Sequence, residues 1–241
     1  MTSSLADHPK AVLCVSLDGR PDDHRQHRSN RPRGAGGGSG ATCPDGYDHL
    51  MDLWPQLVAT PRLVVNQTIA PDLAAAAADN FTHLLSLGLH RFNFLPCYYV
   101  SWSPAQLEAL RSSLKTIAAE IQGRWARGAP LHLRNLFVWA PTPLFNAGLI
   151  VDSDGTIHGS NVGLASPFEE LLDRTRVGTL DQPPSAAALA AQAEAMGSAI
   201  AAALPAEIWE STVAVDRELT HFCRGLYGDW AAYRRRRKEV A

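Results

Sequence analysis

The sequence of 241 residues lacks the features that several broad protein classes require. Its formal net charge is only −2, so no strong overall field draws the chain to nucleic acid. Its N-terminal segment contains no apolar stretch typical of a signal peptide, which favours a cytoplasmic protein. Because Pro, Arg or Asp interrupts the apolar runs, we expect no run of about 18 residues that could span a membrane.

Cysteine is scarce and widely spaced. The sequence has 4 cysteines: Cys14, Cys43, Cys97 and Cys223. They include no C-x-x-C pair, so the sequence predicts neither a disulfide framework nor a zinc site. His24 and His27 lie near two aspartates, but an H-x-x-H in a polar segment indicates a solvated loop more strongly than a metal. We therefore predict no metal site.

Common phosphate-binding and hydrolase motifs are missing as well. The glycine-rich stretch at 34–40 is not followed by Gly-Lys-Ser/Thr, and we predict that it belongs to a flexible loop over about 29–44. The sequence has no G-x-S-x-G elbow. The run DSDG at 152–155 begins like a calcium loop, but Gly163 replaces the required glutamate, so a hairpin turn is favoured. The basic run at 234–238 is typical of a solvated helix end.

Apolar residues make up 46% of the chain, and their pattern predicts an α/β protein with a sizeable core. We expect strands at 11–16, 63–68, 90–95 and 133–139, the first of them fully buried, and helices at 47–57, 71–87 and 103–125. Alternating strands and helices are typical of parallel βαβ units. The segment 19–45 is predicted to be a loop, 148–158 a hairpin, and 185–204 and 206–226 helices.

One group of residues points to a ligand site. Ser16, Asp18 and Gly19 stand at the carboxyl end of the first predicted strand, followed by His24 and Arg28. In parallel α/β folds, ligands bind at the carboxyl ends of the strands. A Ser hydroxyl and an Arg fork could hold a small carboxylate there, and an Asp-Gly turn beside a basic loop is the alternative interpretation.

These residues carry a family resemblance. The pattern SLDGxxxxHxxxR, residues 16–28, resembles the fourth-strand segment of radical S-adenosylmethionine (radical SAM) enzymes, and most of all the anaerobic sulfatase-maturating and peptide-modifying subgroup. Similar features follow in the same order: Gly46-Tyr47-Asp48, Asn66 and Thr68 before Pro71, Leu87-Gly88, FNFLPC at 92–97, GLIVDSDGTIHGSN at 148–161 and VGTL at 177–180. The resemblance covers about residues 10–182.

The resemblance implies an α/β fold of a particular kind. Residues 1–145 would form the C-terminal half of a partial (β/α)6 TIM-like barrel, with strands four to six and their helices. Residues 146–241 would form a C-terminal extension, consisting of a hairpin followed by helices.

The resemblance also implies cofactors and contacts. Ser16 and Arg28 would contact S-adenosylmethionine (AdoMet) around its amino-acid portion, with Asp18 in the same site. Leu95 and Tyr98 would lie near its adenosyl portion. In this family a [4Fe-4S] cluster cleaves AdoMet reductively, and the adenosyl radical takes a hydrogen atom from the substrate.

The sequence departs from the family at the ligands of its clusters. The family's C-x-x-x-C-x-x-C loop is missing, and Ser160-Asn161 stand where sulfatase-maturating relatives have a Cys-Asp pair. A hydroxyl cannot replace a thiolate ligand, nor an amide a carboxylate base. We therefore expect a chain without strands one to three, the product of a truncation, a late start codon or a split gene. Such a chain would expose the edge and inner face of its sheet.

Three functions stay open at this point. The first is a radical SAM protein that acts on a peptide or protein and is inactive without a separate N-terminal cluster-binding segment. The second is a degenerate, non-catalytic relative that binds a peptide or partner. The third is a different α/β barrel enzyme for a phosphorylated metabolite, which the missing phosphate motif disfavours. We expect neither a nucleic-acid nor a membrane partner.

Overall fold

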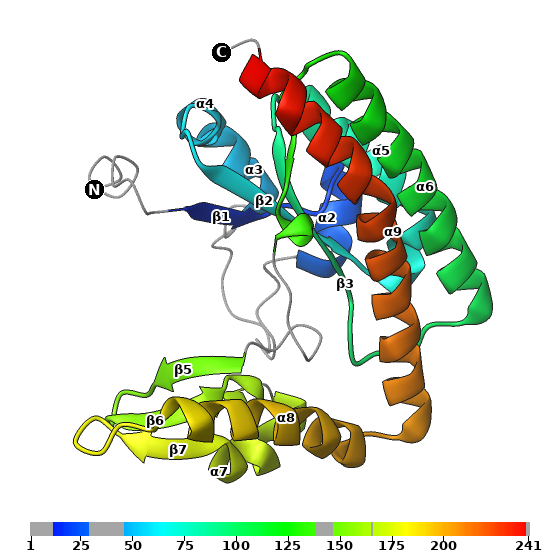
Figure 1. Cartoon of the computed structure of the whole chain (residues 1–241). Coiled ribbons are helices and arrows are strands. Elements are labelled where there is room, and N and C mark those ends of the chain that lie inside the picture. Colours follow the sequence, from blue (N-terminus) through cyan, green and yellow to red (C-terminus); the bar gives the residue numbers. More distant parts are fainter. Residues whose placement is uncertain (1–11, 29–45, 138–146, 165, 240–241) are drawn as a thin grey trace, which may run out of the picture. The chain divides into compact units, whose positions relative to one another are not determined.

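The computed structural model describes residues 12–28, 46–137, 147–164 and 166–239 (Figure 1). The predicted glycine-rich loop and Cys43 lie outside these residues. The chain divides into two compact units. Unit 1 comprises residues 1–97, 103–137 and 218–241, and unit 2 comprises residues 98–102 and 138–217. The long helix α9 (Ala206–Glu239) contributes to both units.

A parallel four-stranded sheet forms the centre of unit 1. Its order is β1 (Leu13–Ser16), β2 (Leu63–Ile69), β3 (Arg91–Pro96) and β4 (His132–Leu133). Ser16 pairs with Asn66, and Thr68 pairs with Leu95. The α/β class with parallel strands is therefore confirmed. The fourth predicted strand is mostly wrong, because Arg134–Leu136 turn into a 3-10 helix after two strand residues.

Helices cover one face of this sheet. They are η1 (Pro71–Ala76), α5 (Ala77–Ser86), α6 (Pro104–Ala126) and the C-terminal part of α9, which lie on the same side of the strands (Figure 1). Ser103 caps α6, because its side chain accepts from the Gln106 backbone amide and Gln106 bonds back in a capping box. The helices bury an aromatic core in which the Phe81 ring meets Phe92 and Phe94 edge-on, at centroid distances of 4.9 and 5.6 Å.

The other face of the sheet is polar. Along β3, Phe92 and Phe94 are fully buried, whereas Arg91, Asn93 and Leu95 are partly exposed. The helices η1, α5, α6 and α9 lie on the opposite side of the sheet (Figure 1). Parallel strands usually read as continuous apolar runs because both of their faces are covered, so this alternation marks a sheet with one open face. We call this surface the open face.

The first strand differs from the prediction. It was expected to be fully buried, but β1 is an edge strand, and Val12 and Leu13 are 46% and 42% exposed. The apolar run AVLCVS predicts a strand correctly, but it cannot show whether that strand lies at the edge or in the middle of the sheet. Within the loop predicted at 19–45, residues Pro21–Arg28 instead form the short helix α2. The helix predicted at 47–57 is present as two short helices, α3 (Gly46–Asp52) and α4 (Trp54–Val58).

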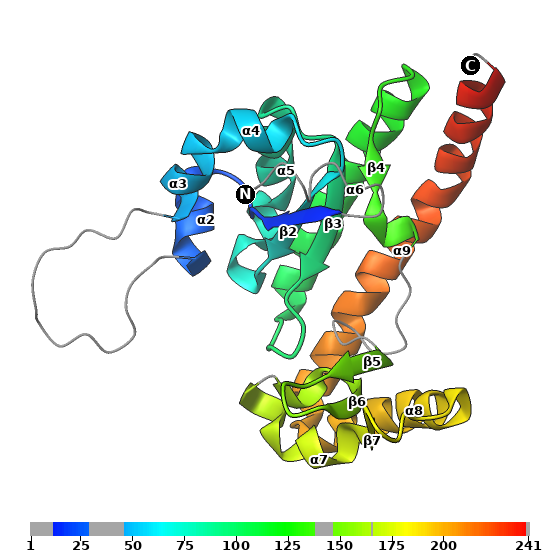
Figure 2. The same ribbon diagram turned by 90° about the vertical axis from the view of Figure 1, so that its left-hand side faces the viewer.

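Unit 2 contains an antiparallel sheet with a helix beside it (Figure 2). Its strands β5 (Ala147–Val151), β6 (Thr156–Ser160) and β7 (Arg176–Thr179) follow in that order, and the first two form the predicted hairpin. Short helices η3 (Val162–Leu164), η4 (Ser166–Leu171) and α7 (Leu172–Thr175) precede β7. Phe168 and Ile200 belong to the buried core between these helices and α8 (Ala186–Ala203).

Helix α8 corrects the expectation that no membrane-length apolar run exists. Its 18 residues have a mean hydropathy of 1.2, and 17% of them are buried, so this described helix is long and apolar enough to cross a membrane. The run is continuous because it consists mainly of alanine, with Glu194 as its one charged residue. One such helix is weak support for a membrane span, since a core helix passes the same test.

Candidate functional site

The sequence-predicted residues at the end of β1 form a connected network. Because Ser16 pairs with Asn66 in parallel register, Asp18 comes level with Thr68 two residues further along each strand. The Asp18 side chain is 5% exposed. Its Oδ1 accepts a hydrogen bond from the Thr68 backbone amide at 3.0 Å. The carboxylate is thus held at the carboxyl ends of two adjacent strands, where parallel α/β folds bind ligands.

Arg28 from α2 completes this network. Its Nε donates to Asp18 Oδ2 at 2.6 Å, and its Nη2 donates to Asp18 Oδ1 at 3.3 Å and to Thr68 Oγ1 at 2.8 Å. Nη1 makes no hydrogen bond to the described residues, and the side chain is 36% exposed. Arg28 is therefore positioned by Asp18 and still presents one nitrogen to a ligand. Nη1 can bind a ligand carboxylate without breaking the contacts to Asp18.

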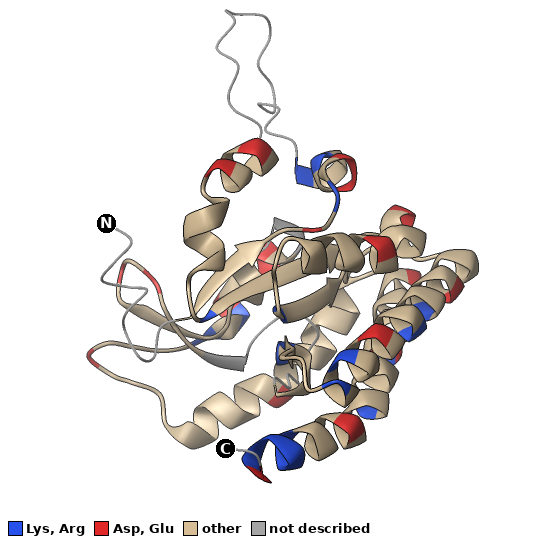
Figure 3. Cartoon of the chain, turned by 90° about the horizontal axis from the view of Figure 1, so that it is seen from above, with Lys and Arg blue, Asp and Glu red and all other residues tan. Residues whose placement is uncertain are grey.

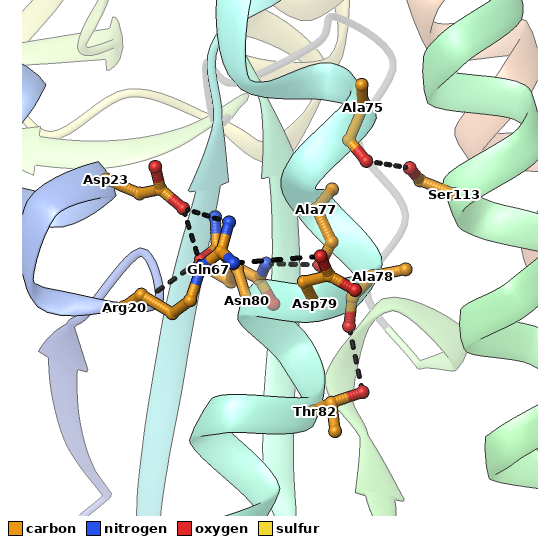
Figure 4. Close-up of polar contacts among 10 residues, drawn as sticks. All are labelled: Arg20, Asp23, Gln67, Ala75, Ala77, Ala78, Asp79, Asn80, Thr82 and Ser113. Carbon is orange, nitrogen blue, oxygen red and sulfur yellow. Dashed lines mark hydrogen bonds and ion pairs between the residues drawn. The ribbon is translucent and has the colours of Figure 1, made fainter.

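The turn after Asp18 packs against α5. Gly19 has a φ of +151°, and a β-carbon there would come within 2.1 Å of the Asn80 side chain. Asn80 is 2% exposed, and its Oδ1 accepts from the Arg20 backbone amide at 2.9 Å (Figure 4). The buried His24 ring accepts from the Asp18 backbone amide through Nδ1 at 3.3 Å. Glycine is thus required for the chain to turn this close to the helix.

The structure also locates the remaining predicted residues. Ser16 is exposed on the open face, and Leu95 pairs with Thr68 on the same sheet. Tyr98 belongs to unit 2, where its hydroxyl donates to Asp216 Oδ1 at 3.3 Å. The sequence analysis missed Thr68 and Asn80 as parts of the site. Thr68 could have been found only from the strand register, and Asn80 only from the packing of α5.

The cysteine and histidine side chains do not converge. Within the described residues, no three His, Cys, Asp or Glu side chains are grouped closely enough to hold a metal ion. His27 Nε2 lies 3.0 Å from Asp72 Oδ1, whereas His24 faces Asp18. Cys97 follows β3, and burial raises the pKa of its thiol. The described residues therefore do not fit a [4Fe-4S] cluster, which needs several thiolates around one centre.

A second group of polar side chains lies toward the amino ends of the strands. Arg91 and His132 are register partners on β3 and β4, and Arg134 follows β4. Arg134 Nη1 reaches to 3.6 Å from Cys14 Sγ on β1, so its side chain crosses the open face. Val64 of β2, one of the two strands in between, is only 2% exposed, as expected for a residue beneath this side chain. We call Arg91, His132 and Arg134 the basic patch.

The basic patch predicts a pH dependence of stability. Burial, followed by the charges of Arg91, Arg134 and Arg234, lowers the pKa of His132 to about 4. Between pH 6.5, the ordinary value, and pH 4, the unfolded chain therefore binds a proton at this histidine that the folded chain does not. The His132 contribution to the free energy of unfolding is fully present above pH 6.5 and is lost as the pH falls toward 4.

The measurement is urea unfolding of the wild type and of His132→Gln at pH 7 and pH 5. The wild type should lose more stability between these two pH values than the variant, because glutamine does not titrate. An equal loss in both proteins would show that His132 is not the group responsible.

Cavities of the described residues lie elsewhere. One of about 600 Å³ lies between α5 and α6 and is lined by residues such as Phe81 and Arg124. Another of about 320 Å³ lies between α6 and α9, beside the Arg111–Glu218 ion pair and Phe222. Neither cavity includes Ser16, Asp18, Arg28 or Leu95.

Comparison with known structures identifies proteins of similar fold. No family model matches the sequence, and no curated protein matches it significantly. A tagged anaerobic sulfatase-maturating enzyme, anSMEcpe, with bound AdoMet matches with a TM-score of 0.55 at 13% identity, covering 78% of this chain and 52% of that one. This chain has the fold of the anaerobic sulfatase-maturating enzymes. The native enzyme with AdoMet and the Kp18Cys peptide matches with a TM-score of 0.53 at 14% identity, covering 77% of this chain and 52% of that one.

The resemblance predicted from the sequence is thus confirmed at the level of the fold. The chain spans about half the length of the sulfatase-maturating structures that it matches. Because the identity is low, the match establishes how the backbone folds and leaves the chemistry to be argued from the side chains.

Proposed function

We propose that this chain is a radical SAM protein that binds AdoMet and acts on a peptide or protein. The observation that carries the proposal is the Asp18–Arg28–Thr68 network, which lies at the carboxyl ends of β1 and β2 in a fold shared with AdoMet-bound enzymes. Fold alone would not suffice, since one fold serves many functions. In this proposal unit 1 is part of a (β/α)6-type barrel, the domains are 1–145 and 146–241, and the protein is cytoplasmic.

Different side chains would contact different parts of AdoMet. Arg28 Nη1 would bind its carboxylate, and the exposed Ser16 hydroxyl would form a hydrogen bond to its amino-acid portion. Asp18 would act indirectly, because it fixes the Arg28 guanidinium and does not itself face the ligand. Leu95 would supply apolar surface to the adenosyl portion, and the contact that the resemblance implies for Tyr98 stays a prediction.

The chain's own residues do not supply a cluster site. The sequence has no C-x-x-x-C-x-x-C motif, and the described cysteines do not converge with other ligand side chains. We therefore propose that a separate segment carries the [4Fe-4S] cluster and that this chain alone binds and orients its ligands without cleaving AdoMet. The exposed edge of β1 is a surface on which such a segment could add a strand.

Calorimetric titration with AdoMet tests the proposal. Ser16→Ala should weaken binding about tenfold, the effect expected for one lost hydrogen bond to a charged group. Ser112→Ala, which removes an exposed hydroxyl from α6, is the matched control and should bind like the wild type. Arg28→Lys should also weaken binding, because lysine keeps the charge near Asp18 but lacks the second arm of the fork.

A second function is favoured by one observation. Ser160, which stands at the position of the family's cysteine, is 4% exposed, and its Oγ accepts from the Val162 backbone amide at 3.3 Å. It serves the fold of unit 2, as expected for a degenerate relative that has lost a cluster ligand at this position. A folded chain that binds peptide but shows no AdoMet binding would establish this alternative and overturn the first proposal.

A further inference from the structure

The basic patch on the open face has no acidic partner within the described residues. None of the salt bridges of that part of the chain involves Arg91, His132 or Arg134. Other arginines of unit 1 do have acidic partners, as Arg20 has Asp23 and Arg111 has Glu218. The patch is therefore an unbalanced concentration of positive charge on one surface.

Arg91 shows this imbalance most clearly. Its Nε is buried and has no hydrogen-bond partner among the described residues. Burial, and then the charge of nearby Arg62, lowers the pKa of its guanidinium. A buried donor without an acceptor costs free energy, and the cost rises when its neighbours carry the same charge. A carboxylate bound beside the partly exposed Arg91 side chain would offset this repulsion between like charges.

The surroundings favour a peptide over a small ion. The patch lies on a sheet surface, and the cavities described above lie between helices instead. Next to it on the same face, Asn93 Nδ2 donates to Asn66 Oδ1 at 3.0 Å, so two amides are available to a peptide backbone. Beside β4, the ring of Phe137 is 48% exposed and contacts Trp230 at 4.9 Å, which gives an apolar rim.

We propose that the basic patch binds a carboxylate side chain of an acidic peptide, and that the substrate of this chain therefore carries Asp or Glu near the residue that is modified. Arg91 and Arg134 would donate to the carboxylate. This inference rests on the proposed function, because it names the class of peptide that the AdoMet-binding protein would take.

The strands set the spacing within that peptide. Arg91 and Leu95 are four residues apart on β3, and Leu95 is level with Thr68 of the AdoMet network. At about 3.3 Å per residue, the basic patch lies about 13 Å from that network. An extended peptide along the open face would therefore place its acidic residue about four positions from the reacting residue.

Fluorescence anisotropy with a defined probe tests the inference. The probe is a labelled twelve-residue Gly/Ser peptide with two glutamates, and its control has glutamine at both positions. The glutamate peptide should bind, more weakly as salt is added, and the glutamine peptide should bind at least about fivefold more weakly. Arg134→Gln should reduce binding of the glutamate peptide about fivefold, because its side chain crosses an exposed surface and is not needed for folding.

Three controls make the outcome decisive. Arg127→Gln removes the same charge from the exposed end of α6 and should leave binding unchanged. Melting curves of Arg91→Gln separate lost binding from lost folding. Inorganic phosphate should compete only weakly, and displacement at concentrations below those of the peptide would reassign the patch to a small anion and overturn the inference. Equal binding of the two peptides would overturn it as well.

The proposed function and the acidic-peptide inference can be refuted independently of each other. AdoMet binding without preference for the glutamate peptide would refute the acidic substrate and leave the radical SAM proposal standing. Preference for the glutamate peptide in a chain that does not bind AdoMet would refute the proposed function and keep the peptide site.

Discussion

Replacing Arg28 with alanine is expected to cost the chain more stability than neutralising its partner, Asp18. The Asp18 side chain is 5% exposed, whereas that of Arg28 is 36% exposed. Removal of the arginine leaves a buried carboxylate with the Thr68 amide as its remaining strong donor. Losing one partner of a fully buried pair costs about 3–5 kcal/mol, and the partial exposure here reduces the expected loss to about 2–3 kcal/mol.

Asp18→Asn should behave differently. The asparagine oxygen can still accept from the Thr68 amide, and Arg28 can turn toward solvent, so we expect a loss of about 1 kcal/mol. The double variant should be more stable than Arg28→Ala alone, because it no longer buries an unpaired charge. Urea unfolding of the four proteins measures all of these values. A double variant less stable than Arg28→Ala would contradict the assignment of the pair as a buried charge partnership.

This asymmetry also bears on AdoMet binding. Loss of affinity in Arg28→Ala could come from the lost guanidinium or from a displaced Asp18. Asp18→Asn tests whether the position of Arg28 matters. This variant removes the carboxylate charge that fixes Arg28 and keeps the Arg28 guanidinium that could contact the ligand. We expect weaker AdoMet binding in Asp18→Asn through a less ordered Arg28, with Asp18 acting as a positioning residue.

The order of strands and helices in unit 1 could be predicted from local signals. The helix at 103–125 has a capping residue and proline at its start, and these signals act within a few residues. The burial of β1 could not be predicted, because an apolar run reads the same at an edge as in the middle of a sheet. The open face, by contrast, was readable from β3, since Arg91 and Asn93 alternate with buried phenylalanines and indicate that one side of the sheet is uncovered.

In the candidate site, too, the residues of a local motif could be predicted and the long-range contacts could not. Asp18 and Arg28 follow directly from a motif at the end of a strand. Thr68 and Asn80 are 50 and 60 residues further along than Asp18 and Arg20, and their contacts depend on strand register and on the docking of α5.

The basic patch was missed for a similar reason. Arg91, His132 and Arg134 are scattered in the sequence, and their side chains share a surface through the pairing of β3 with β4. The run of basic residues at the end of α9 (Figure 3) is conspicuous in sequence, and it reads as a solvated helix end.

Gly19→Ala is expected to have the largest effect of any single methyl addition at the described glycines of unit 1. The added carbon would lie 2.1–2.3 Å from three side-chain atoms of Asn80, a separation that atoms in contact do not tolerate. The residue would also have to keep a φ of +151°. Backbone strain and overpacking each cost about 1–3 kcal/mol, so we expect a loss of about 3–5 kcal/mol in the free energy of unfolding.

Gly128 provides the matched control. It has a φ of +77° and nothing within 4 Å of an added carbon, so Gly128→Ala carries backbone strain without a clash and should cost about 1–2 kcal/mol. Asn80→Gly in the Gly19→Ala background removes the clashing atoms, and this pair should lose less than the sum of the single losses. Equal losses for Gly19→Ala and Gly128→Ala would contradict the close approach. Because Gly19 adjoins Asp18, displacement of this turn would move the carboxylate away from the Thr68 amide, which ties the glycine to the proposed AdoMet site as well as to the fold.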